Sequence, residues 1–113
     1  MDLQQLMNIQ KEFDLKHQGK IPFFEYISDS NIQTLEHLIV CLVGEVGEVS
    51  NVTKKIARGD FSLSDVKSDL SEEITDVFIY LLKICSQLQI NLEDEFIKKL
   101  EKNKGRFKKY EKS

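Results

Sequence analysis

The sequence predicts an all-α protein, a four-helix bundle-like fold in one domain that oligomerisation completes. Apolar residues recur at helical period through long segments of the chain. One proline and five glycines among 113 residues supply few breaks between them. A chain of this length can enclose a core, yet burial of one more face against a second copy would add stability. We therefore expect residues 1–113 to form a single domain.

The composition restricts the class of protein. Hydrophobic residues make up 41% of the chain and charged residues 31%, which is typical of a soluble folded protein. No apolar run approaches the roughly 20 residues that span a bilayer, and the first residues do not resemble a signal peptide. We expect a cytoplasmic protein. Cys41 and Cys85 lie in apolar helical patterns without a CxxC partner, which indicates buried reduced thiols.

The first helix is predicted over residues 2–17, where Leu3, Met7 and Phe13 contribute to an apolar face. Residues 19–33 are irregular and contain the aromatic cluster Phe23, Phe24 and Tyr26. Such a cluster usually packs on the core. The alternative is that it forms one wall of a pocket for a nucleobase.

The second helix is predicted over residues 32–58, with Leu35, Leu38 and Leu42 in its apolar stripe. At about 100° per residue, Glu45 falls inside the edge of this stripe and Glu48 just outside it. A run of charged residues on a helix ordinarily faces solvent. A carboxylate directed at the core must instead be neutralised, paired or bound to a metal.

The third helix, predicted over residues 65–88, repeats this arrangement. Glu73 lies at the edge of its apolar stripe, and Asp76 and Tyr80 lie in the adjoining row. If the second and third helices pack antiparallel, they can bring the four carboxylates of Glu45, Glu48, Glu73 and Asp76 together.

The fourth helix is predicted over residues 92–106, with Asn91 as its N-cap. Residues 98–113 hold eight of the 16 lysines and arginines and only two acids. Their basic side chains could bind phosphate oxygens and Asn103 could hydrogen-bond a ligand, although a solvated helix end is the simpler interpretation of the tail. The residues in question are Lys99, Lys102, Asn103 and Arg106.

Four neighbouring carboxylates repel one another unless a cation lies between them. An all-oxygen set suits Mg²⁺, or Mn²⁺ in its place. A di-iron site is disfavoured, because it requires Glu-x-x-His on two helices and here Glu48 and Asp76 occupy the histidine positions. A magnesium ion held by carboxylates favours hydrolysis of a phosphate-bearing substrate.

The same residues carry a family resemblance. The segments Leu42-Val43-Gly44-Glu45-Val46-Gly47-Glu48 and Glu73-Ile74-Thr75-Asp76-Val77-Phe78-Ile79-Tyr80-Leu81, with the closing basic segment 99–107, resemble the MazG-type all-α nucleoside triphosphate pyrophosphohydrolases. They are close to the dCTP pyrophosphatase-like branch. That branch has a tryptophan at the position of Lys55, so the base preference stays open.

The resemblance implies a Mg²⁺-dependent enzyme, a homodimer or homotetramer, that cleaves an NTP or dNTP to the monophosphate and pyrophosphate in nucleotide-pool house-cleaning. It implies a catalytic metal centre of four carboxylates and nucleotide contacts from the fourth helix and from Tyr80. The implied metal ligands are Glu45, Glu48, Glu73 and Asp76, and the implied contacts on the fourth helix are Lys99, Asn103 and Arg106.

Two other functions remain open. The four acids could pair with lysine or arginine of a neighbouring subunit in a non-catalytic interaction module. The basic tail could bind nucleic acid, although the net charge of −3 argues against this.

Overall fold

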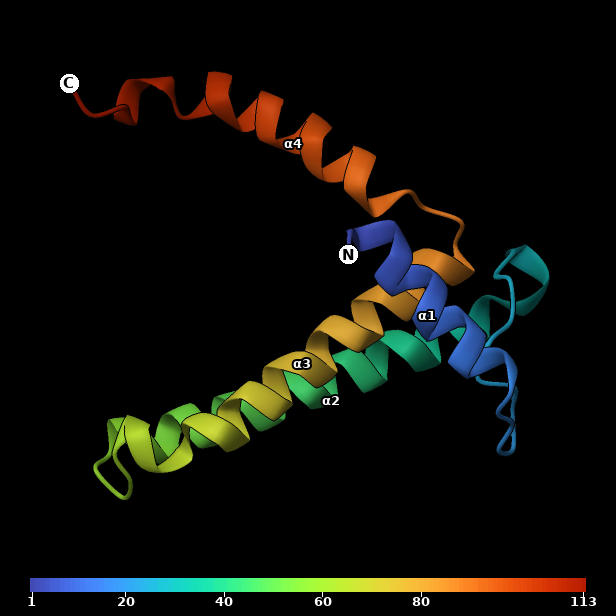
Figure 1. Ribbon diagram of the computed structural model, residues 1–113, viewed down its shortest axis with the longest axis horizontal. Helices are drawn as coiled ribbons and strands as arrows, with labels where there is room; N and C mark the ends of the chain where they lie inside the picture. The colour runs from blue at the N-terminus through green and yellow to red at the C-terminus, as the bar shows by residue number, and fades with distance from the viewer.

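The computed structural model describes residues 1–113 and confirms the all-α prediction, with four α-helices and no β-sheet (Figure 1). The helices are α1 (Leu3–Leu15), α2 (Ile32–Ala57), α3 (Leu63–Gln87) and α4 (Leu92–Arg106). Two short 3₁₀ helices, η1 (Asp29–Asn31) and η2 (Lys108–Tyr110), precede α2 and follow α4.

Local hydrogen bonds explain where the helices begin and end. The Asp2 carboxylate accepts a hydrogen bond from the Gln5 backbone at 2.8 Å and begins α1. Ser62 Oγ accepts from the Asp65 backbone at 3.3 Å, and this capping box begins α3 two residues before the predicted Asp65. Gly59, with φ of +88°, follows the end of α2 in the left-handed conformation that glycine adopts without strain.

Helices α2 and α3 run antiparallel and pack side by side, and α1 crosses them (Figure 1). The core lies at this crossing, where Met7 of α1 packs against Leu82 and Cys85 of α3. Away from the crossing, apolar side chains of the α2–α3 pair stay partly exposed because one chain supplies nothing to cover them. These are Ile39, Val43, Val46, Ile74, Phe78 and Leu81.

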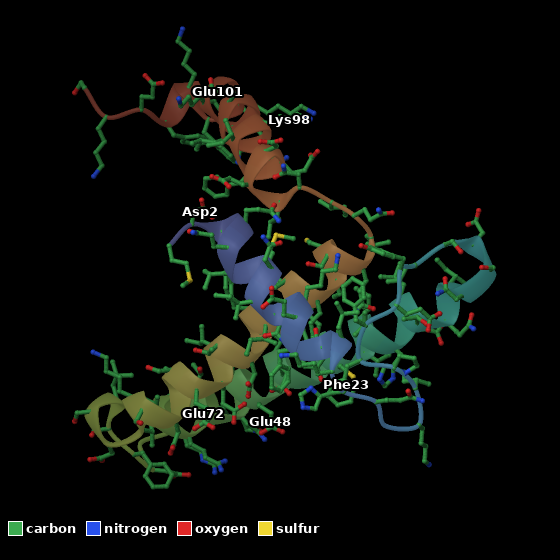
Figure 2. All side chains as sticks on the ribbon, turned by 45° about the vertical axis from the view of Figure 1, so that its right-hand side comes forward. Asp2, Phe23, Glu48, Glu72, Lys98 and Glu101 are labelled. Carbon is green, nitrogen blue, oxygen red and sulfur yellow. The ribbon has the colours of Figure 1, made fainter.

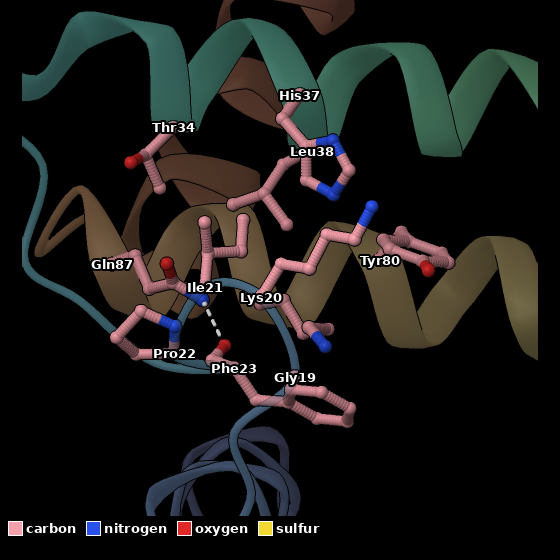
Figure 3. Close-up of a pocket in the computed structure, with 11 residues that line it drawn as sticks. Gly19, Lys20, Ile21, Pro22, Phe23, Thr34, His37, Leu38, Tyr80 and Gln87 are labelled. Atoms are coloured by element: carbon pink, nitrogen blue, oxygen red, sulfur yellow. Dashed lines mark hydrogen bonds between the residues drawn. The ribbon is translucent and has the colours of Figure 1, made fainter.

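Gln87, buried at the end of α3, fastens the segment 23–27 to that helix. Its side-chain amide donates to the Phe23 carbonyl at 3.1 Å, as Figure 3 shows, and its backbone carbonyl accepts from the Ile27 amide at 2.9 Å. Its Oε1 accepts from the Glu25 backbone at 3.4 Å. These three hydrogen bonds hold the segment 23–27 against the end of α3.

Helix α4 runs away from the α2–α3 pair, and the C-terminus lies at its far end (Figure 1). Phe96, Ile97 and Leu100 of this helix are exposed. None of the helices combines the length and the apolar composition that crossing a bilayer requires.

Candidate metal centre

Antiparallel packing of α2 and α3 brings together three of the four acids that the sequence singles out. Carboxylate oxygens of Glu45, Glu73 and Asp76 lie within 4.8 Å of one another, and all three side chains are partly buried. Glu45 comes from the middle of α2, and Glu73 and Asp76 come from adjacent turns of α3. We call this set the acidic cluster.

Glu48 lies outside the acidic cluster and is exposed. Figure 2 labels it on α2. Its charge still acts on the cluster, because it is the strongest of the neighbouring charges that raise the pKa of Glu73.

No positive side chain of the protein neutralises these acids. Its ion pairs are Arg58–Asp60, Lys83–Asp14, Lys98–Glu95 and Lys104–Glu101, and none of them includes a cluster residue. Burial first, and then repulsion from Glu48 and Glu45, raises the pKa of Glu73 above its ordinary range. The donor set, three oxygen ligands with uncompensated charge, fits a hard divalent cation.

Tyr80 lies one turn after Asp76 on α3 and belongs to the same surface. Burial first, and then the Cys41 thiol and the charges of Glu45 and Asp76, raises the pKa of the Tyr80 phenol. Its hydroxyl therefore keeps its proton at neutral pH and can donate a hydrogen bond beside the acidic cluster.

Two cavities follow the surface of α3 away from the acidic cluster. The cluster-side cavity, about 440 Å³, is lined by Glu45 and Asp76 together with Gln10 and Asp14 of α1. The loop-side cavity, about 350 Å³, lies between residues 19–22, α2 and the end of α3 (Figure 3). Both are also lined by Phe23, Tyr80 and Lys83, and we call the two cavities together the hollow.

The residues of the aromatic cluster take both roles that the sequence allows, packing on the core and forming the wall of a pocket. Phe24 is buried and meets Tyr26 edge-on, with ring centroids 5.1 Å apart. Phe23 instead lines both cavities. Packing on the core thus accounts for Phe24, and Phe23 is the member placed to form the wall of a pocket.

The basic residues of α4 are not brought to the acidic cluster within one chain. Lys99 and Lys102 line a hollow formed by α4 itself, with Glu95 and Lys98. The guanidinium of Arg106 lies 5.0 Å from the centroid of the Phe107 ring. Asn103 is partly buried, and its Oδ1 has no hydrogen-bond partner.

The structure also identifies residues that sequence reasoning missed, namely Asp14, Lys83 and Gln87. Asp14 is 1% exposed, and its Oδ1 lies 3.5 Å from Lys83 Nζ. A signal was present, because Asp14 follows the core residue Met7 by seven positions and Lys83 follows Asp76 by seven, which places each on the same helix face. A single polar residue on such a helix face does not predict a site unless the residue that it pairs with is also known.

A known protein family matches the part of the chain that carries the acidic cluster. The family model described as the MazG nucleotide pyrophosphohydrolase domain matches residues 33–110, which include the acidic cluster, Glu48 and Tyr80. The chain is similar to the Gene 37 protein of Mycobacterium phage L5, with 32% identity over 78 residues, or 67% of this chain and 68% of that protein. No solved structure matches the chain.

Proposed function

The chain belongs to the MazG nucleotide pyrophosphohydrolase family, and from this premise we propose that residues 1–113 form one Mg²⁺-dependent catalytic domain. The domain would cleave a nucleoside triphosphate, NTP or dNTP, to the monophosphate and pyrophosphate. The observation that carries the proposal is the acidic cluster, whose three carboxylate oxygens lie within 4.8 Å of one another without a positive partner.

Glu45, Glu73 and Asp76 would hold the metal, with Glu48 completing the set. When bound, Mg²⁺, or Mn²⁺ in its place, would neutralise phosphate charge and lower the pKa of a bound water. The Tyr80 hydroxyl, which keeps its proton, would donate to the nucleotide beside the carboxylates.

We further propose that the active enzyme is a homodimer or homotetramer. Apolar side chains on the α2–α3 pair and on α4 are exposed in the single chain, which supports an interface there. A second copy could bring its own α4 beside the cluster. Lys99, Lys102, Asn103 and Arg106 would then contact the phosphates of the substrate.

This activity suits nucleotide-pool house-cleaning in the cytoplasm, and that role is part of the proposal. The second candidate is a non-catalytic helical interaction module, which the exposed apolar residues of the α2–α3 pair also favour. Turnover of a nucleotide separates the two.

The test is pyrophosphate release from a panel of NTPs and dNTPs, in Mg²⁺ and in EDTA. We expect metal-dependent release, and we expect Asp76→Asn to lower turnover by at least about a hundredfold, because even residues that only support metal ligands can cost that much. Glu72→Gln, which removes an exposed carboxylate of the same helix, is the matched control and should retain activity. Circular dichroism shows that each variant is helical.

Orthophosphate as the product would contradict the bond assignment. Full activity of Asp76→Asn would remove the acidic cluster from the reaction. If the folded wild-type protein released no product from any nucleotide, the interaction module would be the better interpretation.

A further inference from the structure

The proposed substrate leaves unexplained a buried ion pair that lines the hollow beyond the acidic cluster. Asp14 of α1 is 1% exposed and Lys83 of α3 is 12% exposed. A buried ion pair rarely adds net stability over apolar residues of the same volume, so its presence beside a cavity calls for another explanation.

Most of the hydrogen-bonding capacity of the Lys83 ammonium is unused. Its anionic partner, Asp14 Oδ1, lies at 3.5 Å, which is long for a hydrogen bond. That oxygen already accepts from Gln10 Nε2 at 3.0 Å. An ammonium has three donors, and both cavities reach Lys83, so its protons are available to a ligand.

The surroundings of Lys83 suit a flat aromatic ligand. Its Nζ lies 5.0 Å from the centroid of the Phe23 ring and 5.4 Å from that of Tyr80. Aromatic rings at the wall of a pocket can stack on a nucleobase. Gln87 fixes the Phe23 backbone through its bond to the carbonyl, so this wall is held in place before a ligand binds.

Position along α3 separates this site from the phosphates. Asp76, Tyr80, Lys83 and Gln87 follow one another at three- and four-residue spacing on one helix face. Lys83 therefore lies about 10 Å along the helix axis from Asp76, at a rise of about 1.5 Å per residue. A triphosphate bound at the acidic cluster can direct its base into the hollow at Lys83.

Charge also favours a base over a phosphate at this point. The Asp14 carboxylate offsets the Lys83 ammonium, so the pair has little net attraction for an anion. The ammonium remains a strong donor to a neutral oxygen. The Asp14 carboxylate contacts both Lys83 and Gln10 through one oxygen, Oδ1. Its other oxygen, Oδ2, has no hydrogen-bond partner.

We propose that Lys83 is a specificity-determining residue that donates a hydrogen bond to a carbonyl oxygen of the substrate's base, and that Asp14 is the residue that positions it. The inference rests on the proposed nucleotide substrate and extends it. It disfavours adenine, which carries no carbonyl oxygen, and admits the bases that have one. It does not involve any residue of the acidic cluster.

The test compares dITP with dATP, because the two differ chiefly by an oxo or an amino group on the purine. We expect the wild type to have a kcat/KM about tenfold or more higher for dITP, which is the effect of one hydrogen bond to a charged donor. Inorganic tripolyphosphate is the control without a base. In Lys83→Met the ratio of dITP to dATP should fall toward one.

Asp14→Asn preserves the shape of the positioning residue and removes its charge. It should lower the same ratio in part, through a higher KM for dITP with kcat retained. Lys16→Met, an exposed lysine of the same helix end that lines neither cavity, should keep the wild-type ratio. If Lys83→Met does not fold, the double variant Asp14→Asn/Lys83→Met removes both charges and takes its place.

Equal rates for dITP and dATP in the wild type would overturn the proposal. So would a loss in Lys83→Met that is as large for tripolyphosphate, because it would indicate a phosphate contact or a damaged fold. Calorimetric binding of dIMP and dAMP decides the question independently of hydrolysis. Tighter binding of dIMP that Lys83→Met abolishes supports the base contact even if no pyrophosphate is released, and equal binding overturns it.

Discussion

The Asp14 carboxylate and the three carboxylates of the acidic cluster differ in how their charge is compensated. Asp14 is almost completely buried and has a lysine of α3 as its partner. Glu45, Glu73 and Asp76 are only partly buried and have no positive partner. The comparison teaches that burial alone does not identify a metal site. A metal site is indicated instead by negative charges that the fold brings close together without a positive partner.

The largest effect on stability should come from breaking the compensated pair. Lys83→Met leaves the Asp14 carboxylate buried without its partner, which should lower the free energy of unfolding by about 3 kcal/mol. A chain of this size would lose on the order of 10 °C in melting temperature. Urea unfolding followed by circular dichroism measures the change.

The double variant Asp14→Asn/Lys83→Met provides the control, because it removes both charges and should recover most of the lost stability. If the single variant were as stable as the wild type, the ion pair would not be the compensated site that its burial indicates.

A smaller effect should come from supplying the charge that the acidic cluster lacks. Mg²⁺ at a hundred times its dissociation constant should stabilise the wild type by about 2.7 kcal/mol, because only the folded state assembles the site. Thermal melting in Mg²⁺ and in EDTA measures this shift. The shift should vanish in Asp76→Asn and persist in Glu72→Gln, and an unchanged shift in Asp76→Asn would mean that the metal binds elsewhere.

The smallest effect should be a pH dependence in the metal-free protein. The pKa of Glu73 is raised in the folded state above its ordinary value of 4.5, by burial first and by its acidic neighbours second. The folded state therefore holds the Glu73 proton more tightly than the unfolded state does. Ionisation of Glu73 costs stability as the pH rises from 4.5 through the raised pKa.

Glu73→Gln removes this cost. In EDTA the variant should be more stable than the wild type at neutral pH, and the difference should disappear as the pH falls to 4.5. Urea midpoints between pH 4 and pH 7 test the trend, with Asp69→Asn, an exposed acid of α3 that does not act on the pKa of Glu73, as the comparison. A difference that stays constant with pH would show that repulsion at Glu73 is not its cause.

The predicted site residues of α2 and α3 also differ from those of α4 in how far the sequence could place them. Glu45 and Glu73 were identifiable in the sequence because each places a charge at the edge of an apolar stripe. The two stripes pack against each other, and this packing brings the two carboxylates together. Lys99 and Arg106 lie on the part of α4 beyond Leu92, where Phe96, Ile97 and Leu100 stay exposed. Their contact with a nucleotide stays a prediction, because nothing within one chain covers the apolar residues Phe96, Ile97 and Leu100 beside them.

The order of residues alone predicted the four helices and the four carboxylates at the margins of two apolar stripes, three of which the fold brings into the acidic cluster. Periodicity and capping are local properties, and a carboxylate inside an apolar stripe is visible in the order of residues alone. The tertiary structure decided that Asp14 meets Lys83, that Gln87 fastens Phe23 to α3, and that α4 leaves the other helices. These features depend on how segments distant in the sequence cross, and a single polar residue does not specify its distant partner.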